Sequence, residues 1–251
     1  MNRIEKSQET YKKLFGDGVS AAQATDPDFQ DILSRFIFGE VFYQGDLDDQ
    51  LRELITLVVL ATNQTLPQLK AHVHAALNIG LTPVEIKEAI YQCAPYLGFP
   101  KTLNALTEIN EVFKERNIAL PLVSQKQVEE DHRLDKGLAV QVEIFGDILK
   151  KNRESAPSNQ KHIQDYLSAF CFGDFYTRGG LDLKTRELLT LCVLGALGGA
   201  ESQVKAHVRG NLNVGNDKET MISAITHCLP YMGFPRTLNT LSCVNEVIPE
   251  G

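Results

Sequence analysis

Two pairs of ionisable residues recur in this chain at nearly the same spacing, and their types suit proton transfer. Glu53 precedes His72 by 19 residues, and Glu187 precedes His207 by 20. A carboxylate can orient an imidazole and tune its proton affinity, which is what general acid–base catalysis requires. We therefore predict that Glu53, His72, Glu187 and His207 are the catalytic residues.

Spacing alone does not establish contact within either pair. If the chain turns back near residues 63–67, Glu53 lies about 15 Å along its helix from the turn and His72 about 8 Å, at a rise of about 1.5 Å per residue. The two side chains of a pair could then interact only through an oblique helix crossing, a bridging water or a partner copy. The alternative is a half-buried histidine that donates to a backbone carbonyl and has no chemical role.

The remaining polar candidates stand beside the histidines or in a later Y-x-G-F-P segment. We predict that five of them contact the ligand, and that the cations among the five bind its anionic groups: Lys70, Lys205, Arg209, Tyr96 and Tyr231. The alternative for the cations is a solvated position beside an apolar stripe. Only the second half carries an arginine two residues after its histidine, because the first half has His74 there.

The candidates come in pairs because the sequence repeats itself. Residues 70–112 align with residues 205–247 without a gap, and 22 of the 43 pairs are identical. Matching segments further upstream extend the repeat over nearly the whole chain. We therefore predict two domains, 1–120 and 132–251, joined by a polar linker over 121–131.

Hydrophobic periodicity predicts that each copy is helical. In segment 48–60, apolar residues recur at positions i, i+3, i+4 and i+7. Pro67 suits the first turn of the next helix, which Gly80 would close, and Thr82 opens a T-P-V-E capping box. We expect Pro95 and Pro100 to mark the end of that third helix. The predicted fold class is all-α, with five or six helices per copy and no strand.

Composition disfavours several other classes of protein. A net charge of −7 without a cluster of Lys and Arg argues against nucleic acid as a partner. No apolar run is long enough to span a membrane, and the first residues lack the apolar segment of a signal peptide. We expect a cytoplasmic protein with a small anionic organic substrate, five buried reduced cysteines, no metal and no cofactor.

The motifs around the second glutamate–histidine pair resemble those of a known family. The runs R-E-L, K-A-H-V-R-G-N-L-N-V-G and C-L-P-Y-M-G-F-P-R-T-L-N are similar to the conserved core of the carboxymuconolactone decarboxylase family, and the first copy carries related runs. The resemblance implies two tandem copies of an alkylhydroperoxidase D-like helical domain. Such domains assemble into rings of six, so two fused copies would form the ring as a homotrimer.

One branch of this family reduces peroxides with the motif C-x-x-C-x-x-x-H. Here its two cysteine positions hold Thr65 and Gln68 in the first copy, and Ala200 and Gln203 in the second. Neither a hydroxyl nor an amide replaces a thiolate as nucleophile at neutral pH. We therefore disfavour an alkylhydroperoxidase or peroxiredoxin-like antioxidant activity and expect any turnover to be independent of thiols.

The decarboxylase branch of the family also lacks these cysteines. Resemblance to it implies a cofactor-independent lyase, similar to 4-carboxymuconolactone decarboxylase, that acts on a small carboxylated lactone or a related acid. His207 would protonate the dienolate left by loss of carbon dioxide, Glu187 would orient it, and Arg209 and Lys205 would hold substrate carboxylates. Because His74 stands in place of an arginine, we expect the second copy to carry more of the function.

A non-catalytic binding or scaffold protein of the same fold is the remaining alternative. A pocket at Glu187 and His207 would favour the enzyme over the scaffold.

Overall fold

The computed structural model describes residues 1–17 and 22–250, and this part of the chain is helical without a strand, which confirms the all-α prediction. The first copy contains α1 (Arg3–Phe15), α2 (Ala22–Thr25), α3 (Pro27–Gly39), the 3-10 helix η1 (Val41–Tyr43), α4 (Asp49–Asn63), α5 (Leu66–Asn78), α6 (Pro83–Leu97) and α7 (Phe99–Glu115). The second contains the 3-10 helix η2 (Glu130–His132), α8 (Arg133–Phe145), α9 (Ile148–Ser155), α10 (Lys161–Tyr166), the π-helix η3 (Leu167–Tyr176), α11 (Leu183–Leu197), α12 (Glu201–Asn213), α13 (Lys218–Met232) and α14 (Phe234–Val247).

The prediction of five or six helices per copy is too low, since each copy has seven α-helices within the described residues. The additional helices are short: α2 has four residues, α10 has six and α9 has eight. A helix of one or two turns presents too few apolar residues for a 3.6-residue period to be recognised.

Local sequence signals account for most helix boundaries. The Asp48 carboxylate accepts a hydrogen bond from the backbone N–H of Leu51 and caps α4, and Asp182 caps α11 in the same way. The predicted capping box is present, with Thr82 and Glu85 bonded reciprocally at the start of α6.

The end of α6 falls between Pro95 and Pro100, as predicted, and Pro95 itself lies inside the helix. The helix continues through this proline to Leu97 and ends at Gly98, whose φ of +77° is costly for other residues. Pro230 lies inside α13 in the same way. A proline removes one backbone hydrogen bond, and the burial of the surrounding turns offsets this cost.

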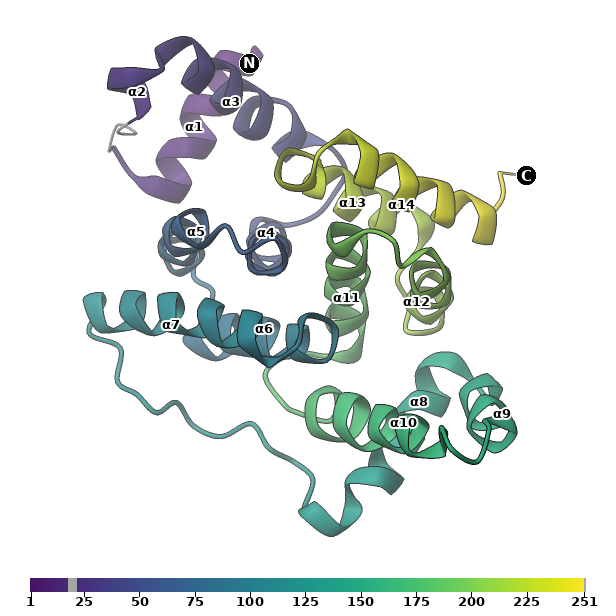
Figure 1. Cartoon of the computed structure of the whole chain (residues 1–251). Helices are drawn as coiled ribbons and strands as arrows, with labels where there is room; N and C mark the ends of the chain where they lie inside the picture. The colour runs from purple at the N-terminus through teal and green to yellow at the C-terminus, as the bar shows by residue number, and fades with distance from the viewer. Residues whose placement is uncertain (18–21, 251) are drawn as a thin grey trace.

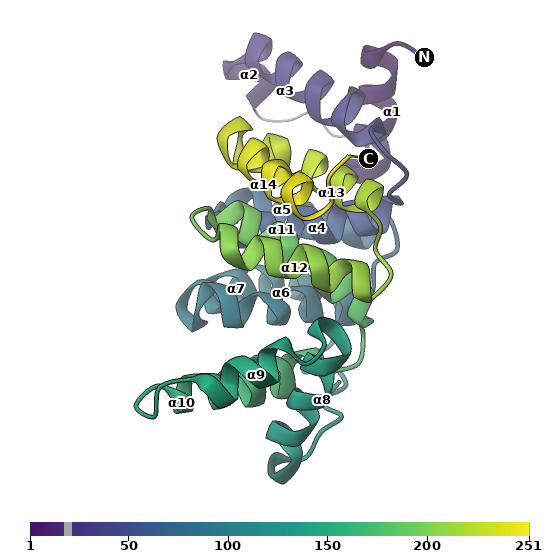
Figure 2. The same ribbon diagram turned by 90° about the vertical axis from the view of Figure 1, so that its right-hand side faces the viewer.

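The helices are arranged in three tiers (Figures 1 and 2). The group α1–α3 lies at one end of the molecule and the group α8–α10 at the other, with the remaining helices of both copies between them. The segment between α7 and η2 is extended and runs along the outside (Figure 1). Each end group covers its own copy, since α1 packs on α3 and α5 while α8 packs on η3 and α12.

The two copies share one hydrophobic core. Helix α4 contacts α11 and α13 of the second copy, and α11 contacts α4 and α6 of the first. A single cluster of buried side chains contains residues of all eight middle helices, among them Leu57 of α4 and Leu191 of α11. Each copy therefore completes the core of the other. No helix in the described residues is long and apolar enough to cross a membrane.

Polar contacts between the copies differ at the two matching interfaces. In the second copy, the buried Arg186 donates from Nη1 to Gln92 Oε1 (3.0 Å) and from Nη2 to Glu88 Oε2 (3.1 Å). The matching Arg52 donates to backbone carbonyls, and its Nη1 has no partner within the described residues. The first interface therefore lacks the side-chain acceptors that the second has.

His227 occupies the position in α13 that Gln92 occupies in α6. Its Nε2 lies 3.0 Å from Thr56 Oγ1, whereas its Nδ1 has no partner in the described part of the chain. Burial, followed by the positive charge of Arg52, lowers the pKa of His227 to about 3. The imidazole is therefore neutral in the folded protein at any physiological pH.

We predict that His227→Gln makes the protein less sensitive to acid. Because the unfolded histidine takes up a proton below about pH 6.5 and the folded one does not, His227 should cost about 1.4 kcal/mol of folding free energy per pH unit below that value. The variant should keep about 2 kcal/mol more stability at about pH 5 relative to wild type. A glutamine should also accept from Arg52, adding about 1 kcal/mol at neutral pH.

Urea unfolding of both proteins, at one protein concentration and at the two pH values, measures these differences. An equal loss of stability on acidification in both proteins would contradict the assignment to His227.

Candidate functional site

Each predicted glutamate–histidine pair is in direct contact within its own copy. His72 Nδ1 lies 2.8 Å from Glu53 Oε2, and His207 Nδ1 lies 2.8 Å from Glu187 Oε2. The carboxyl-bearing residues are 1% and 0% exposed, and each histidine is 8% exposed. The helices α4 and α5, like α11 and α12, therefore pack so that neither a bridging water nor another chain is needed.

The contact determines which imidazole nitrogen is available for chemistry. A carboxylate only accepts hydrogen bonds, so Nδ1 carries the proton and donates it, leaving Nε2 free to face a ligand. The alternative in which each Nδ1 donates to a backbone carbonyl is wrong. A buried carboxylate that orients an imidazole is the arrangement that acid–base catalysis uses.

Each pair is completed by a tyrosine of the other copy. The ring of Tyr231, on α13, lies 5.8 Å from the ring of His72, and the ring of Tyr96, on α6, lies 5.9 Å from that of His207. A phenylalanine of the same copy packs edge-on against each histidine, at 5.4 Å and 5.2 Å: Phe15 and Phe145. Both predicted tyrosines thus lie at the sites, each opposite the histidine of the other copy.

The second site contains a chain of hydroxyl groups that sequence reasoning missed. Tyr176, on η3, donates to Glu187 Oε1 (2.6 Å), and its hydroxyl lies 3.1 Å from that of Tyr96. The first copy has Phe42 at the matching position. The sequence signal that could have identified Tyr176 is therefore a hydroxyl present in only one of the two copies. Glu53 consequently has His72 as its only side-chain partner within the described residues.

These tyrosines remain protonated donors. Burial, and then the negative charge of Glu187, raises the pKa of Tyr176 well above its ordinary value. Burial is also the main cause of the raised pKa of Tyr96. Neutral hydroxyls beside a buried carboxylate stabilise its charge without competing for the proton that His207 would transfer.

A cavity of about 1030 Å³ opens onto the second site. His207 and Tyr96 line it, whereas Glu187 lies behind the histidine and does not. Most of the wall comes from α9, α10, η3 and α12, and it is mainly apolar. A large pocket with a few convergent polar groups is the usual form of a small-molecule site.

Among the predicted cations, Arg209 alone lines this cavity. Its guanidinium is exposed and has no hydrogen bond or ion pair within residues 1–17 and 22–250, so it is available to an anion. In the first copy the matching His74 is held by Glu115 and Arg116, 3.1 Å and 3.0 Å away.

The two predicted lysines lie elsewhere. Lys205 pairs with Glu246 at 2.5 Å, and Lys70 pairs with Glu115 at 2.7 Å and Glu111 at 3.2 Å. Neither lines the cavity at His207. The geometry gives them surface ion pairs on α14 and α7, and we assign neither lysine a contact with the ligand.

The thiols are poorly suited to redox chemistry. All five cysteines are free and buried. Burial raises the pKa of the Cys171 thiol to about 12 and raises that of Cys93 further, so neither provides a thiolate at neutral pH. Within the described residues no group of three or more His, Cys, Asp and Glu side chains could hold a metal ion.

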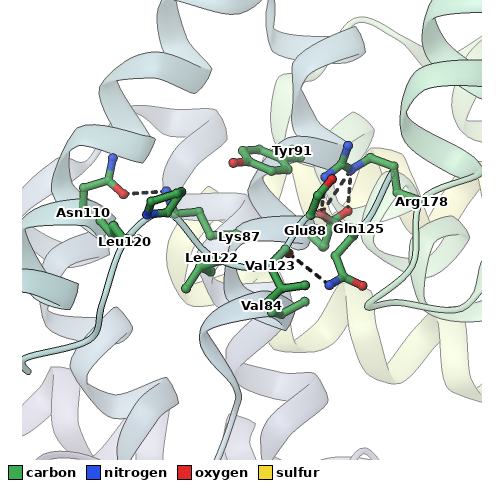
Figure 3. A pocket seen from close by; sticks show the side chains of 12 residues that line it. Val84, Lys87, Glu88, Tyr91, Asn110, Leu120, Leu122, Val123, Gln125 and Arg178 are labelled. Atoms are coloured by element: carbon green, nitrogen blue, oxygen red, sulfur yellow. Dashed lines mark hydrogen bonds and ion pairs between the residues drawn. The ribbon is translucent and has the colours of Figure 1, made fainter. Parts of the chain in front are cut away.

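A second cavity, of about 520 Å³, lies beneath the linker and is distinct from both histidine sites (Figure 3). Its charged side chains already have partners. Arg178 binds Glu88 through two nitrogens, and Lys87 Nζ donates to Asn110 Oδ1 at 2.5 Å. Because Glu88 also pairs with Arg186, this cluster braces α11, the helix that carries Glu187.

Comparison with known proteins places one family profile on both halves of the chain and yields several relatives that each match part of it. The profile of the carboxymuconolactone decarboxylase family matches residues 27–111 and again residues 161–246. The 4-carboxymuconolactone decarboxylase of Acinetobacter baylyi is 39% identical over 124 residues, 49% of this chain and 92% of that protein. The nitrosuccinic acid decarboxylase of Metarhizium robertsii is 26% identical over 123 residues, 42% of this chain and 85% of that protein. Peroxisomal protein 2 of Schizosaccharomyces pombe is 22% identical over 143 residues, which are 56% of this chain and 65% of that protein.

Proposed function

The chain belongs to the carboxymuconolactone decarboxylase family, and from this premise we propose that it is a cofactor-independent carboxy-lyase whose reaction takes place at His207. The observation that carries the proposal is the second site itself. A buried Glu187 orients His207 at the wall of a cavity that Arg209 also lines, and the Arg209 guanidinium has no hydrogen bond or ion pair among the residues that the structure describes.

The reaction needs only the groups that this site contains. Cleavage of the bond to the leaving carboxylate releases carbon dioxide, and its electron pair moves towards the substrate carbonyl to give an enolate. A protonated His207 would donate from Nε2 to the carbon of this enolate, and solvent would restore the proton. Glu187 would counter the charge of the imidazolium, and Arg209 would hold a second carboxylate of the substrate.

The names of two relatives support this class of reaction. One is a 4-carboxymuconolactone decarboxylase and the other a nitrosuccinic acid decarboxylase, so both act on small acids that lose a carboxyl group. We propose a carboxylated lactone or a related acid as the substrate. The absence of cysteines at positions 65, 68, 200 and 203 argues against peroxide reduction, and the cavity at His207 argues against a scaffold without a ligand.

We further propose that the second copy is the more active one. It has the Tyr176 hydroxyl on its glutamate and a free Arg209 at its cavity, whereas the first copy has Phe42 and a His74 engaged by neighbours. A guanidinium binds a carboxylate at any physiological pH, and a neutral imidazole does not.

The first test compares matched substitutions in the two copies. His207→Asn should lower kcat for release of carbon dioxide by about 10²-fold or more, the usual contribution of a general acid, and His72→Asn should lower it much less. Carbon dioxide release from 4-carboxymuconolactone and from nitrosuccinic acid is the measurement, with thermal unfolding as the control for folding. Equal losses would refute the inequality of the copies. No turnover of either acid by the wild type would refute the proposed function.

We also propose that the chain assembles as a homotrimer, a ring of six copies. Large apolar side chains of α7 and α14 are more than half exposed away from the cavity, and neighbouring chains would cover them: Phe99, Leu103, Phe234 and Leu238. Light scattering should therefore give about three times the chain mass of 27.9 kDa. A monomer at micromolar concentration would contradict this.

A further inference from the structure

The cavity at His207 is larger and more apolar than a small carboxylated lactone requires. Its volume of about 1030 Å³ is at the upper end of the range for sites that hold drug-sized ligands, which reach about 1,000 Å³. Apolar side chains form most of its wall: Phe145, Ile148, Leu149, Ile163, Tyr166, Leu167, Phe170, Phe172 and Leu212. A small polar acid would leave most of this surface in contact with water.

The chain segment that forms part of this wall is longer in the second copy than in the first. The alignment of the copies shifts from an offset of 130 at Phe15 and Phe145 to 134 at Phe38 and Phe172, so the second copy is four residues longer between these points. At the offset of 134, α3 of the first copy matches α10 and the start of η3, so the extra residues lie before α10, in the stretch that includes α9. Figure 2 shows α9 and α10 side by side below α12, the helix that carries His207.

The apolar side chains of α9 and α10 are exposed although they face a cavity. Ile148 is 55% exposed, Ile163 54% and Tyr166 64%. Exposure of neighbouring large apolar side chains is costly, and covering them yields about 25 cal/mol per Å². The wall therefore favours an occupant with an apolar body.

The charge on the cavity wall indicates what the other end of this occupant carries. Among the described residues that line the cavity, Arg209 alone carries a permanent charge, and it has no acidic partner. Arg209 and His207 lie two residues apart on α12, and both reach the cavity. One cation at an otherwise apolar wall is complementary to a molecule with one anionic end.

We propose that the ligand of the second copy is an amphipathic carboxylic acid. Its carboxylate binds Arg209 beside His207, and its hydrocarbon or aryl body lies against α9, α10 and η3. The proposal rests on the proposed function for the reaction at His207, whereas the binding mode stands on the cavity and can be tested without turnover. A second protein chain is a less suitable occupant, because it would have to supply an acidic group at Arg209 and fill the space before His207.

The test measures the affinity of straight-chain saturated carboxylates, from butanoate to decanoate, by isothermal titration below their micelle concentrations. These acids bind without being decarboxylated. Each methylene that reaches the apolar wall should lower Kd about fourfold, so the logarithm of Kd should fall linearly along the series.

Three variants separate the parts of the site. Arg209→Gln should raise Kd by a similar factor for every acid and leave the slope unchanged. The double variant Ile163→Asn and Tyr166→Asn should weaken the longer acids most and flatten the slope. Ile4→Asn changes an exposed apolar residue of α1 that does not line the cavity, so it should change neither quantity.

A Kd that does not depend on chain length would overturn the proposal, as would an unchanged slope in the double variant of α10. A normal slope in a protein without decarboxylase activity would sink only the proposed function. Decarboxylation of small acids together with a flat series would sink only the amphipathic ligand.

Discussion

A carboxylate that water cannot reach must be held by hydrogen-bond donors, because the cost of removing its charge from water is several kcal/mol. Each copy of this chain buries one such group beside its histidine, Glu53 in α4 and Glu187 in α11. The histidine of the following helix is the donor in both cases. The packing of α4 on α5 and of α11 on α12, and with it the orientation of each imidazole, follows from this requirement. A tyrosine ring of the opposite copy packs against each histidine.

Duplication has allowed the two sites to diverge while the shared core holds them in place. The second copy has the better supported carboxylate, because Tyr176 donates to Glu187 where the first copy has Phe42. The second copy also has the better satisfied arginine at the interface between the copies, because Arg186 donates to the side chains of Gln92 and Glu88. Every one of these differences strengthens the site that faces the large cavity.

The sequence alone was sufficient for the features that depend on local pattern or on repetition. The helices carrying Glu53, His72 and their counterparts follow from apolar periodicity, and the capping box at Thr82 from the preference of a helix start. The contact between glutamate and histidine could not be predicted from the sequence, because it depends on how the two helices cross and not on the number of residues between the two side chains.

Other features were predicted imprecisely or missed, for distinct physical reasons. Pro95 marks the end of α6 only to within two residues, because the buried helix continues past it to Leu97. Lys205 is indistinguishable from Arg209 as a cation in the sequence, yet a glutamate of α14 engages it. The cavity depends on α9 and α10, which are too short to be recognised by periodicity.

We propose above all that the glutamate–histidine pair of the second copy, at His207, binds the ligand more tightly than the pair of the first copy does. A crystal structure of the protein soaked with a dicarboxylate that it does not decarboxylate tests this most directly. The account predicts a carboxylate bound through two nitrogens of Arg209, with the ligand within hydrogen-bond distance of His207 Nε2, and its body against α9 and α10. A ligand bound at His72, or beneath the linker beside Lys87, with the cavity at His207 empty, would contradict it.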